Sequence, residues 1–288
     1  MSARRASSPL YVRAPQGRNP AGHLRDVWSH RRQLAFFGHR LIEKRYIRTW
    51  LGMLWIPLRP ALDVAMRTLL FGGLLAISSA GLPYMVFFSV GMAAWMMLES
   101  SALWATRSLE VNRAVLRRIH VPRLVPLVSA IAPALLEFGL YLAIAAIAVV
   151  YYGIADGTTY VQSPFGVDGL LALAGLATLA LIGLGIGLWA SPFVAQARDI
   201  RFGFGYVVGL WLFLTPVIYP IDSIPEAYRP LAEYNPATAP VEAFKHALLG
   251  TPAPSGTSWT VSLVTAAVLL GSGLWFSARK EREVLHYH

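Results

Sequence analysis

The sequence has no cysteine and very little charge. The absence of cysteine among 288 residues excludes disulfides, thiol nucleophiles, iron–sulfur clusters and cysteine-ligated zinc. Charged residues make up 14% of the chain, whereas soluble proteins carry about a quarter. Hydrophobic residues make up 56%, and the mean hydropathy is +0.51. This balance argues against a water-soluble globule and predicts an integral membrane protein.

Motifs of catalysis are also missing. The chain contains no G-x-x-x-x-G-K-[ST] phosphate loop, so we expect it not to hydrolyse ATP by itself. It contains no H-E-x-x-H, G-x-S-x-G or acidic D-x-D cluster, and its seven histidines are scattered. The sequence therefore predicts no catalytic residue, no metal site and no cofactor in this chain.

Six apolar stretches are long enough, or nearly so, to cross a bilayer, which takes about 20 residues. They lie near 58–79, 84–107, 124–152, 169–195, 202–219 and 258–278. A nucleic-acid-binding protein could share the net charge of +10 but would not carry these runs, so nucleic acid is not an expected partner.

The basic residues predict the orientation of the chain. Eleven of them fall within the first 50 residues, and most others follow spans 2, 4 and 6, so that 21 of the 25 lie on one side. Because positive charge stays cytoplasmic, both termini are expected inside, with six transmembrane helices. Residues 1–23 lack the apolar core of a signal peptide and are expected to form a disordered cytoplasmic tail. Residues 283–288 are expected to form a cytoplasmic C-terminal tail.

Three segments outside the spans have patterns of their own. In 24–48 apolar pairs recur at seven-residue steps among basic residues, which predicts an amphipathic interface helix, broken near Gly38. A plain membrane anchor and a mechanical role are both open for it. The loop after span 2 has helix-forming residues that suit a docking element, although an ordinary basic loop has the same composition. Residues 220–251 are proline-rich, apolar and too short to span, which favours a re-entrant helix pair on the outer side, near 225–233 and 238–249.

Charged residues inside the spans have two interpretations. Arg59, Asp63 and Arg67 share one helical face, where they could meet phosphates or simply neutralise one another. Glu99 and Glu137 are lone carboxylates that a proton-coupled transporter would need, but interhelical hydrogen bonding needs them equally.

Aromatic residues follow one face of span 5. Phe202, Tyr206 and Phe213 lie at steps of four and seven residues, and Phe204 and Trp211 occupy a neighbouring face. Aromatic rings stack on the apolar faces of sugars, so this face suits a glycan; lipid-facing or packing aromatics would have the same spacing. The small-xxx-small pairs Gly183/Gly187 and Gly205/Gly209 predict close helix packing.

Three motifs, in order along nearly the whole chain, resemble a known family. The first is R-Y-I-R-T-W-L-G-M-L-W-I-P-L-R-P at 45–60. The second runs from Pro83-Tyr84 to Pro122-Arg123 and Pro126. The third comprises T-P-V-I-Y-P at 215–220, Pro225, Asn235-Pro236 and E-A-F at 242–244. These motifs are similar to those of the membrane subunits of ABC exporters for lipid-linked polysaccharides, such as O-antigen, teichoic acid, capsule and galactan.

The resemblance implies roles for particular residues. Residues 110–119 would form the coupling helix that contacts the ATPase, through Glu110, Asn112, Arg113, Leu116, Arg117 and Arg118. The pyrophosphate of the lipid carrier would meet Arg45, Arg48 and Arg59 at the cytoplasmic entrance. The glycan would pass Phe202, Tyr206 and Phe213, and the outer gate would include Pro220, Pro225, Asn235 and Pro236.

The expected protein is thus an all-α permease in the bacterial cytoplasmic membrane, with a six-span domain over 49–282. The resemblance implies a homodimer with two copies of an ATP-binding subunit that holds ATP and Mg, in contact with membrane lipids and a lipid-linked polysaccharide. A proton-coupled transporter or flippase that uses Glu99 or Glu137 is the alternative. A membrane-embedded transferase is disfavoured because no catalytic constellation is present.

Overall fold

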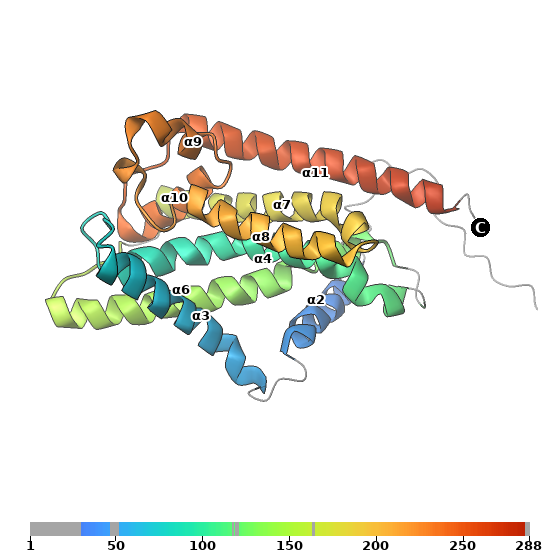
Figure 1. Ribbon diagram of the computed structural model, residues 1–288, viewed down its shortest axis with the longest axis horizontal. Helices are drawn as coiled ribbons and strands as arrows, with labels where there is room; N and C mark the ends of the chain where they lie inside the picture. Colours follow the sequence, from blue (N-terminus) through green and yellow to red (C-terminus); the bar gives the residue numbers. More distant parts are fainter. Residues whose placement is uncertain (1–29, 47–51, 117, 119–120, 163–164, 286–288) are drawn as a thin grey trace, which may run out of the picture.

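The computed structural model describes residues 30–46, 52–116, 118, 121–162 and 165–285 (Figure 1). Every regular element in this part of the chain is helical. The elements, in chain order, are α2 (Arg31–Tyr46), η1 (Gly52–Leu54), α3 (Trp55–Arg67), η2 (Thr68–Leu74), α4 (Tyr84–Leu116), α5 (Leu124–Val128), α6 (Ile131–Asp156), α7 (Val167–Val194), α8 (Arg198–Leu214), η3 (Ile221–Ser223), η4 (Glu226–Tyr228), α9 (Arg229–Glu233), α10 (Thr238–Leu249) and α11 (Gly256–Leu285).

Four helical stretches are long and apolar enough to cross a membrane. They are Tyr84–Leu116, Leu124–Asp156, Val167–Val194 and Gly256–Ser277. The predicted spans 1 and 5 correspond to shorter helices. α3 passes into η2, which is a π-helix and ends at Leu74, and α8 has 17 residues.

The central helix is α4. It contacts α6 and α7 on two sides, and α3, α8 and α10 also pack against it. Figure 1 shows α11, α7, α4 and α6 as successive layers, with α3 crossing them obliquely and α8 running roughly along α4 and α7. The membrane-length window of α4 is 89% buried, against 17% for that of α11. An apolar helix that is buried all round is the core of a bundle.

Glycines allow α7 to approach α4 closely. A Cβ added at Gly183 would collide with Ser101 and Leu98, and one added at Gly187 would collide with Ala105. The close helix packing predicted from Gly183 and Gly187 is confirmed. Gly205 and Gly209 on α8 differ, because a Cβ at either would meet no described atom within 4 Å.

The predicted interface helix 24–48 is described only in part: α2 spans Arg31–Tyr46, and residues 24–29 and 47–48 lie outside the described residues. α2 continues through Gly38, so the predicted break is wrong. A Cβ at Gly38 would lie 2.7 Å from Cβ of Ala132, which shows that the glycine brings α2 against the start of α6. Phe37 and Leu41 on α2 are fully buried. Part of the apolar surface of α2 therefore packs against α5 and α6.

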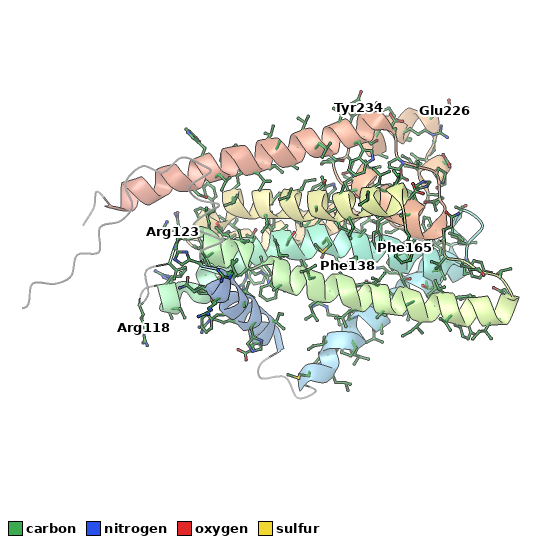
Figure 2. The ribbon with its side chains drawn as sticks, turned by 180° about the vertical axis from the view of Figure 1, so that it is seen from behind. Arg118, Arg123, Phe138, Phe165, Glu226 and Tyr234 are labelled. Atoms are coloured by element: carbon green, nitrogen blue, oxygen red, sulfur yellow. The ribbon has the colours of Figure 1, made fainter. Side chains whose placement is uncertain are left out.

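The two ends of the bundle differ in charge. Figure 2 shows Arg118 and Arg123 at one end and Glu226 and Tyr234 at the other. We call these the basic end and the acidic end.

Candidate functional site

The face of α4 between α3 and α8 carries charged residues toward the basic end. Glu99, Arg107 and Glu110 lie eight and three residues apart, a spacing that keeps them on one side of an α-helix. At the last turns, Nη1 of Arg201 on α8 lies 3.4 and 3.5 Å from the two carboxylate oxygens of Glu110. This ion pair joins the start of α8 to the end of α4.

Charged side chains on α3 are neutralised by neighbouring side chains. Nε of Arg67 lies 2.9 Å from Oδ1 of Asp63, and the hydroxyl of Tyr141 donates to Oδ2 of Asp63 over 2.9 Å. Glu99 accepts a 2.6 Å hydrogen bond from the indole of Trp95. The predicted mutual neutralisation thus holds for Asp63 and Arg67, with a tyrosine that spacing alone did not suggest. Arg59 lies one turn nearer the start of α3 and is exposed.

The predicted aromatic face of α8 is exposed in the single chain. Phe202, Tyr206 and Phe213 are 59%, 77% and 49% exposed. Trp211, predicted on a neighbouring face, lies on the opposite side of α8 and packs edge-on against Trp95, with ring centroids 5.8 Å apart. α8 therefore presents one aromatic face to the bundle and another away from it.

Asn235 is the centre of hydrogen bonding in the predicted gate. Its side-chain oxygen accepts from the indole N–H of Trp211 at 2.9 Å and from the backbone N–H of Ala237 at 3.1 Å. Its amide donates to the carbonyl of Leu214 at 3.0 Å and to the hydroxyl of Thr215 at 2.9 Å. This buried side chain fixes the turn between α9 and α10 against the end of α8. Of the predicted gate prolines, Pro220 and Pro236 are half-buried and Pro225 is exposed.

Lys245 on α10 is a buried cation that the sequence analysis did not single out. Its Nζ donates to the carbonyl of Pro216 over 2.6 Å and lies 4.3 Å from the ring centroid of Phe87 on α4. Burial lowers the pKa of Lys245 to about 8, and the nearby Glu242 partly opposes this. Burial raises the pKa of Glu242. The sequence signal that could have identified this cation is a lysine within the largely apolar segment 237–249.

The predicted coupling residues lie at the end of α4. Residues 110–116 form its last two turns and continue it without a break, whereas residues 117 and 119 lie outside the described residues. Asn112 is fully buried and donates to the carbonyl of Ser108 over 2.9 Å, which places it inside the bundle. Arg113 and Arg118 are exposed and Leu116 is half-buried, whereas Arg117 lies outside the described residues.

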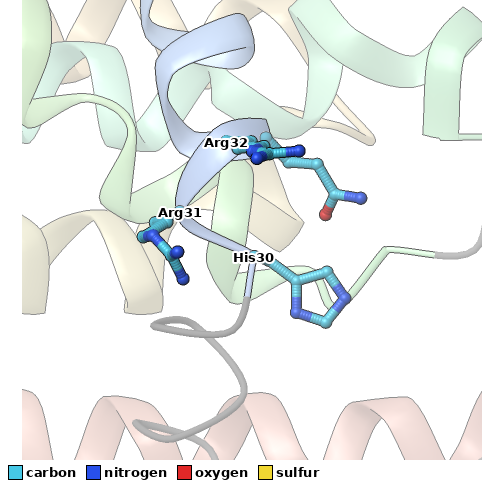
Figure 3. Close-up of a pocket in the computed structure, with 4 residues that line it drawn as sticks. His30, Arg31 and Arg32 are labelled. Carbon is cyan, nitrogen blue, oxygen red and sulfur yellow. The ribbon is translucent and has the colours of Figure 1, made fainter.

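The predicted phosphate-binding residues are only partly described. Arg45 belongs to α2, but its side chain and the whole of Arg48 lie outside the described residues. A pocket at the start of α2 is lined by His30, Arg31, Arg32 and Gln33 (Figure 3). Both of these arginines are exposed, so the pocket is an open cationic hollow. Within the described ranges, no group of His, Asp and Glu is arranged to hold a metal ion.

Comparisons with known proteins give the family. The ABC-2 type transporter family matches residues 33–249, which is most of the chain. The chain belongs to the ABC-2 transporter family. It is therefore a multi-pass, non-catalytic membrane subunit, and ATP hydrolysis belongs to a separate ATP-binding partner.

Two relatives carry the same description. The O-antigen export system permease protein RfbA of Myxococcus xanthus is 24% identical over 262 residues, which cover 90% of this chain and 96% of the relative. The protein of the same name from Klebsiella pneumoniae is 22% identical over 212 residues, which cover 74% and 78%. The family resemblance read from the three motifs is thereby confirmed.

Proposed function

We propose that this chain is the permease of an ATP-driven exporter that moves a polyprenyl-pyrophosphate-linked polysaccharide across the bacterial cytoplasmic membrane. The observation that carries the proposal is the match to the ABC-2 family, together with two O-antigen export permeases that align over most of their length. The exposed aromatic face of α8 supports a glycan as cargo.

The proposed topology has six spans with both termini in the cytoplasm. Four helical stretches supply spans 2, 3, 4 and 6. α3 with η2 supplies span 1, and α8 with the turn that follows it supplies span 5. The basic end with Arg118 and Arg123 then faces the cytoplasm, as the positive-inside rule requires. The acidic end with α9 and α10 forms the outer gate, and α10 is re-entrant, shielded from lipid by α4, α7 and α11.

The proposed assembly is a homodimer with two ATP-binding subunits, which hold ATP and Mg. α3, η2 and α8 support the dimer because they expose large apolar side chains along one side of the chain. These include Leu62, Met66, Leu69, Leu74, Tyr206, Leu210 and Phe213. Two copies facing each other would cover this surface and enclose a conduit, with the charged face of α4 behind it.

The proposed coupling passes through the end of α4. ATP binding closes the partner's nucleotide-binding dimer, which pushes on Arg113, Leu116 and Arg118. Because Glu110 is paired with Arg201, movement of the last turns of α4 reaches α8 directly. α8 in turn holds the gate through Trp211 and Asn235.

Purification of the tagged chain from its native membranes in mild detergent tests the proposal. We expect an ATP-binding subunit near one-to-one by mass spectrometry, and loss of surface polysaccharide when the gene is deleted. A preparation without an ATPase, combined with normal surface polysaccharide, would reject it and favour the proton-coupled alternative. Substitution of Glu99 or Glu137 by glutamine would then be the next measurement.

A further inference from the structure

We propose that Lys245 and Tyr84 are positioning residues for export, because they clamp the non-helical end of span 5 between α10 and α4 and so hold the outer gate in place on the bundle. The inference rests on the proposed function, since a gate has a role only if the chain exports a substrate. The clamped segment is residues 214–218, which lead from the end of α8 to the short helices of the gate.

The clamped segment lies inside the bundle, although its backbone is non-helical after Leu214. Thr215, Val217 and Ile218 are each 2% exposed or less. In the proposed topology this irregular backbone lies at membrane depth, where lipid offers no hydrogen-bond partner to a free carbonyl group. The carbonyl groups of the segment therefore need donors from other parts of the protein.

Side chains from three places supply these donors. Nζ of Lys245 on α10 donates to the carbonyl of Pro216 over 2.6 Å. The hydroxyl of Tyr84, the first residue of α4, donates to the carbonyl of Ile218 over 2.9 Å. Together with the bond from Asn235 to the end of α8, they fix the segment to α10, to α4 and to the turn between α9 and α10.

The charge of Lys245 is compensated where it meets the clamped segment. A fully buried ammonium group is costly unless its surroundings favour it. Nζ lies 4.3 Å from the ring centroid of Phe87 on α4, and an aromatic face attracts a cation. The carbonyl groups at the end of α8 carry the partial negative charge of a helix C-terminus. An apolar side chain would lose these interactions, so the cation itself holds α10 to α4 and to the end of α8.

The start of α4 is shaped to receive the clamp. A Cβ added at Gly91 would lie 3.3 Å from the carbonyl oxygen of Val217 and 3.4 Å from Cδ of Lys245, so a larger side chain would press on both. The ring of Tyr84 stacks on that of Phe88, with centroids 6.1 Å apart. This stacking orients the hydroxyl toward the clamped segment.

Spin labels on the full chain in nanodiscs test the clamp. The chain has no cysteine, so cysteines introduced at Leu231 on α9 and Tyr151 on α6 would carry the only labels. Both positions are exposed, and an excess of unlabelled chain restricts the measured pairs to single chains. Double electron–electron resonance then gives the distribution of distances between the gate and the bundle.

Lys245→Met and Tyr84→Phe should each broaden this distribution and lower polysaccharide export per folded chain several-fold. Tyr84→Phe removes only a hydroxyl, so it keeps the test decisive if Lys245→Met fails to fold. Lys245→Arg keeps the charge and should preserve the wild-type distribution. The matched control is Tyr160→Phe, which removes a hydroxyl that donates to Asp156 only four residues away, and it should change neither quantity.

An unchanged distribution in both Lys245→Met and Tyr84→Phe would overturn the proposal, and so would lower export without broadening. A distribution in Lys245→Arg as broad as that of Lys245→Met would also overturn it, because the cation would then not be what holds the gate. The distance measurement needs neither the ATPase nor the polysaccharide, so it stands if the proposed function fails. Failure of the clamp, in turn, leaves the ATPase pull-down intact.

Discussion

The indole N–H of Trp211 donates to Oδ1 of Asn235 over 2.9 Å, which ties α8 to the turn between α9 and α10. Trp211 also packs edge-on against Trp95, whose own N–H donates to Glu99. A continuous set of contacts therefore leads from the charged face of α4, through two tryptophans, to the predicted gate. Movement of α8 cannot leave this gate unaffected unless the bonds of Asn235 to Trp211 and to Leu214 both break.

Replacement of Asn235 by alanine should destabilise the protein. It leaves the Trp211 and Ala237 N–H groups and the Leu214 carbonyl without this buried partner, and each such loss costs about 1–3 kcal/mol. The thermal midpoint of the purified chain in detergent, followed by tryptophan fluorescence, should fall clearly. Asp222→Asn at an exposed position is the control, and an Asn235→Ala midpoint equal to that of the control would contradict the bonding described here.

Two glycine substitutions should behave oppositely. Gly183→Ala forces a Cβ into Ser101 and Leu98, so we expect lower expression and early unfolding. Gly205→Ala meets open space within the chain and replaces the poorest non-proline helix former, which favours the helix by about 1 kcal/mol. Size-exclusion profiles and thermal midpoints measure the difference, and equal midpoints would refute the close approach of α7 to α4.

The exposed aromatic face should matter for transport more than for folding. Phe202→Ala combined with Tyr206→Ala should reduce polysaccharide export several-fold while dimer assembly persists. The control is Tyr151→Ala on α6, an aromatic side chain that is 65% exposed on another helix. Surface polysaccharide is quantified in a deletion strain complemented by each variant. Normal export in the double variant would show that the glycan does not use this face.

Substitutions at the end of α4 should separate docking from packing. Arg113→Ala removes an exposed side chain, so ATP hydrolysis should continue while export falls. Asn112→Ala removes a buried side chain, so it should lower the thermal midpoint. ATPase activity, export and thermal midpoint are measured for both variants. If Arg113→Ala exports normally, the proposed contact with the ATPase is incorrect.

Lys245 predicts a pH dependence of stability. Its pKa is about 8 in the folded chain against an ordinary value of 10.5, so the unfolded chain binds more protons between these values. The free energy of unfolding should therefore rise as pH increases from about 8 to 10.5 and stay level, for this group, below pH 8. Thermal midpoints of the wild type and of Lys245→Met, compared across this range, isolate the effect. A rise of equal size in the variant would assign it to another group.

Composition and local pattern were sufficient for the broad character of the protein. Runs of apolar residues predict membrane helices because a bilayer leaves backbone groups no partner except one another. The proline-rich segment 220–251 predicted short helices instead of a span, and short helices occur there as α9 and α10. The glycines 183 and 187 predicted a close contact, because small residues let two helices approach.

The tertiary structure decided which side of each helix faces the bundle. Periodicity places Phe202 and Trp211 on opposite faces of α8. Only the packing of Trp211 against Trp95 shows which of these faces is inward. Loop composition marked 110–119 as basic and helical, but the rotation of α4 buries Asn112 and exposes Arg113. The pairs Glu110–Arg201 and Asp63–Tyr141 join residues 91 and 78 positions apart. Such pairs depend on how helices dock, which is set by contacts distant in sequence and is therefore absent from any local pattern.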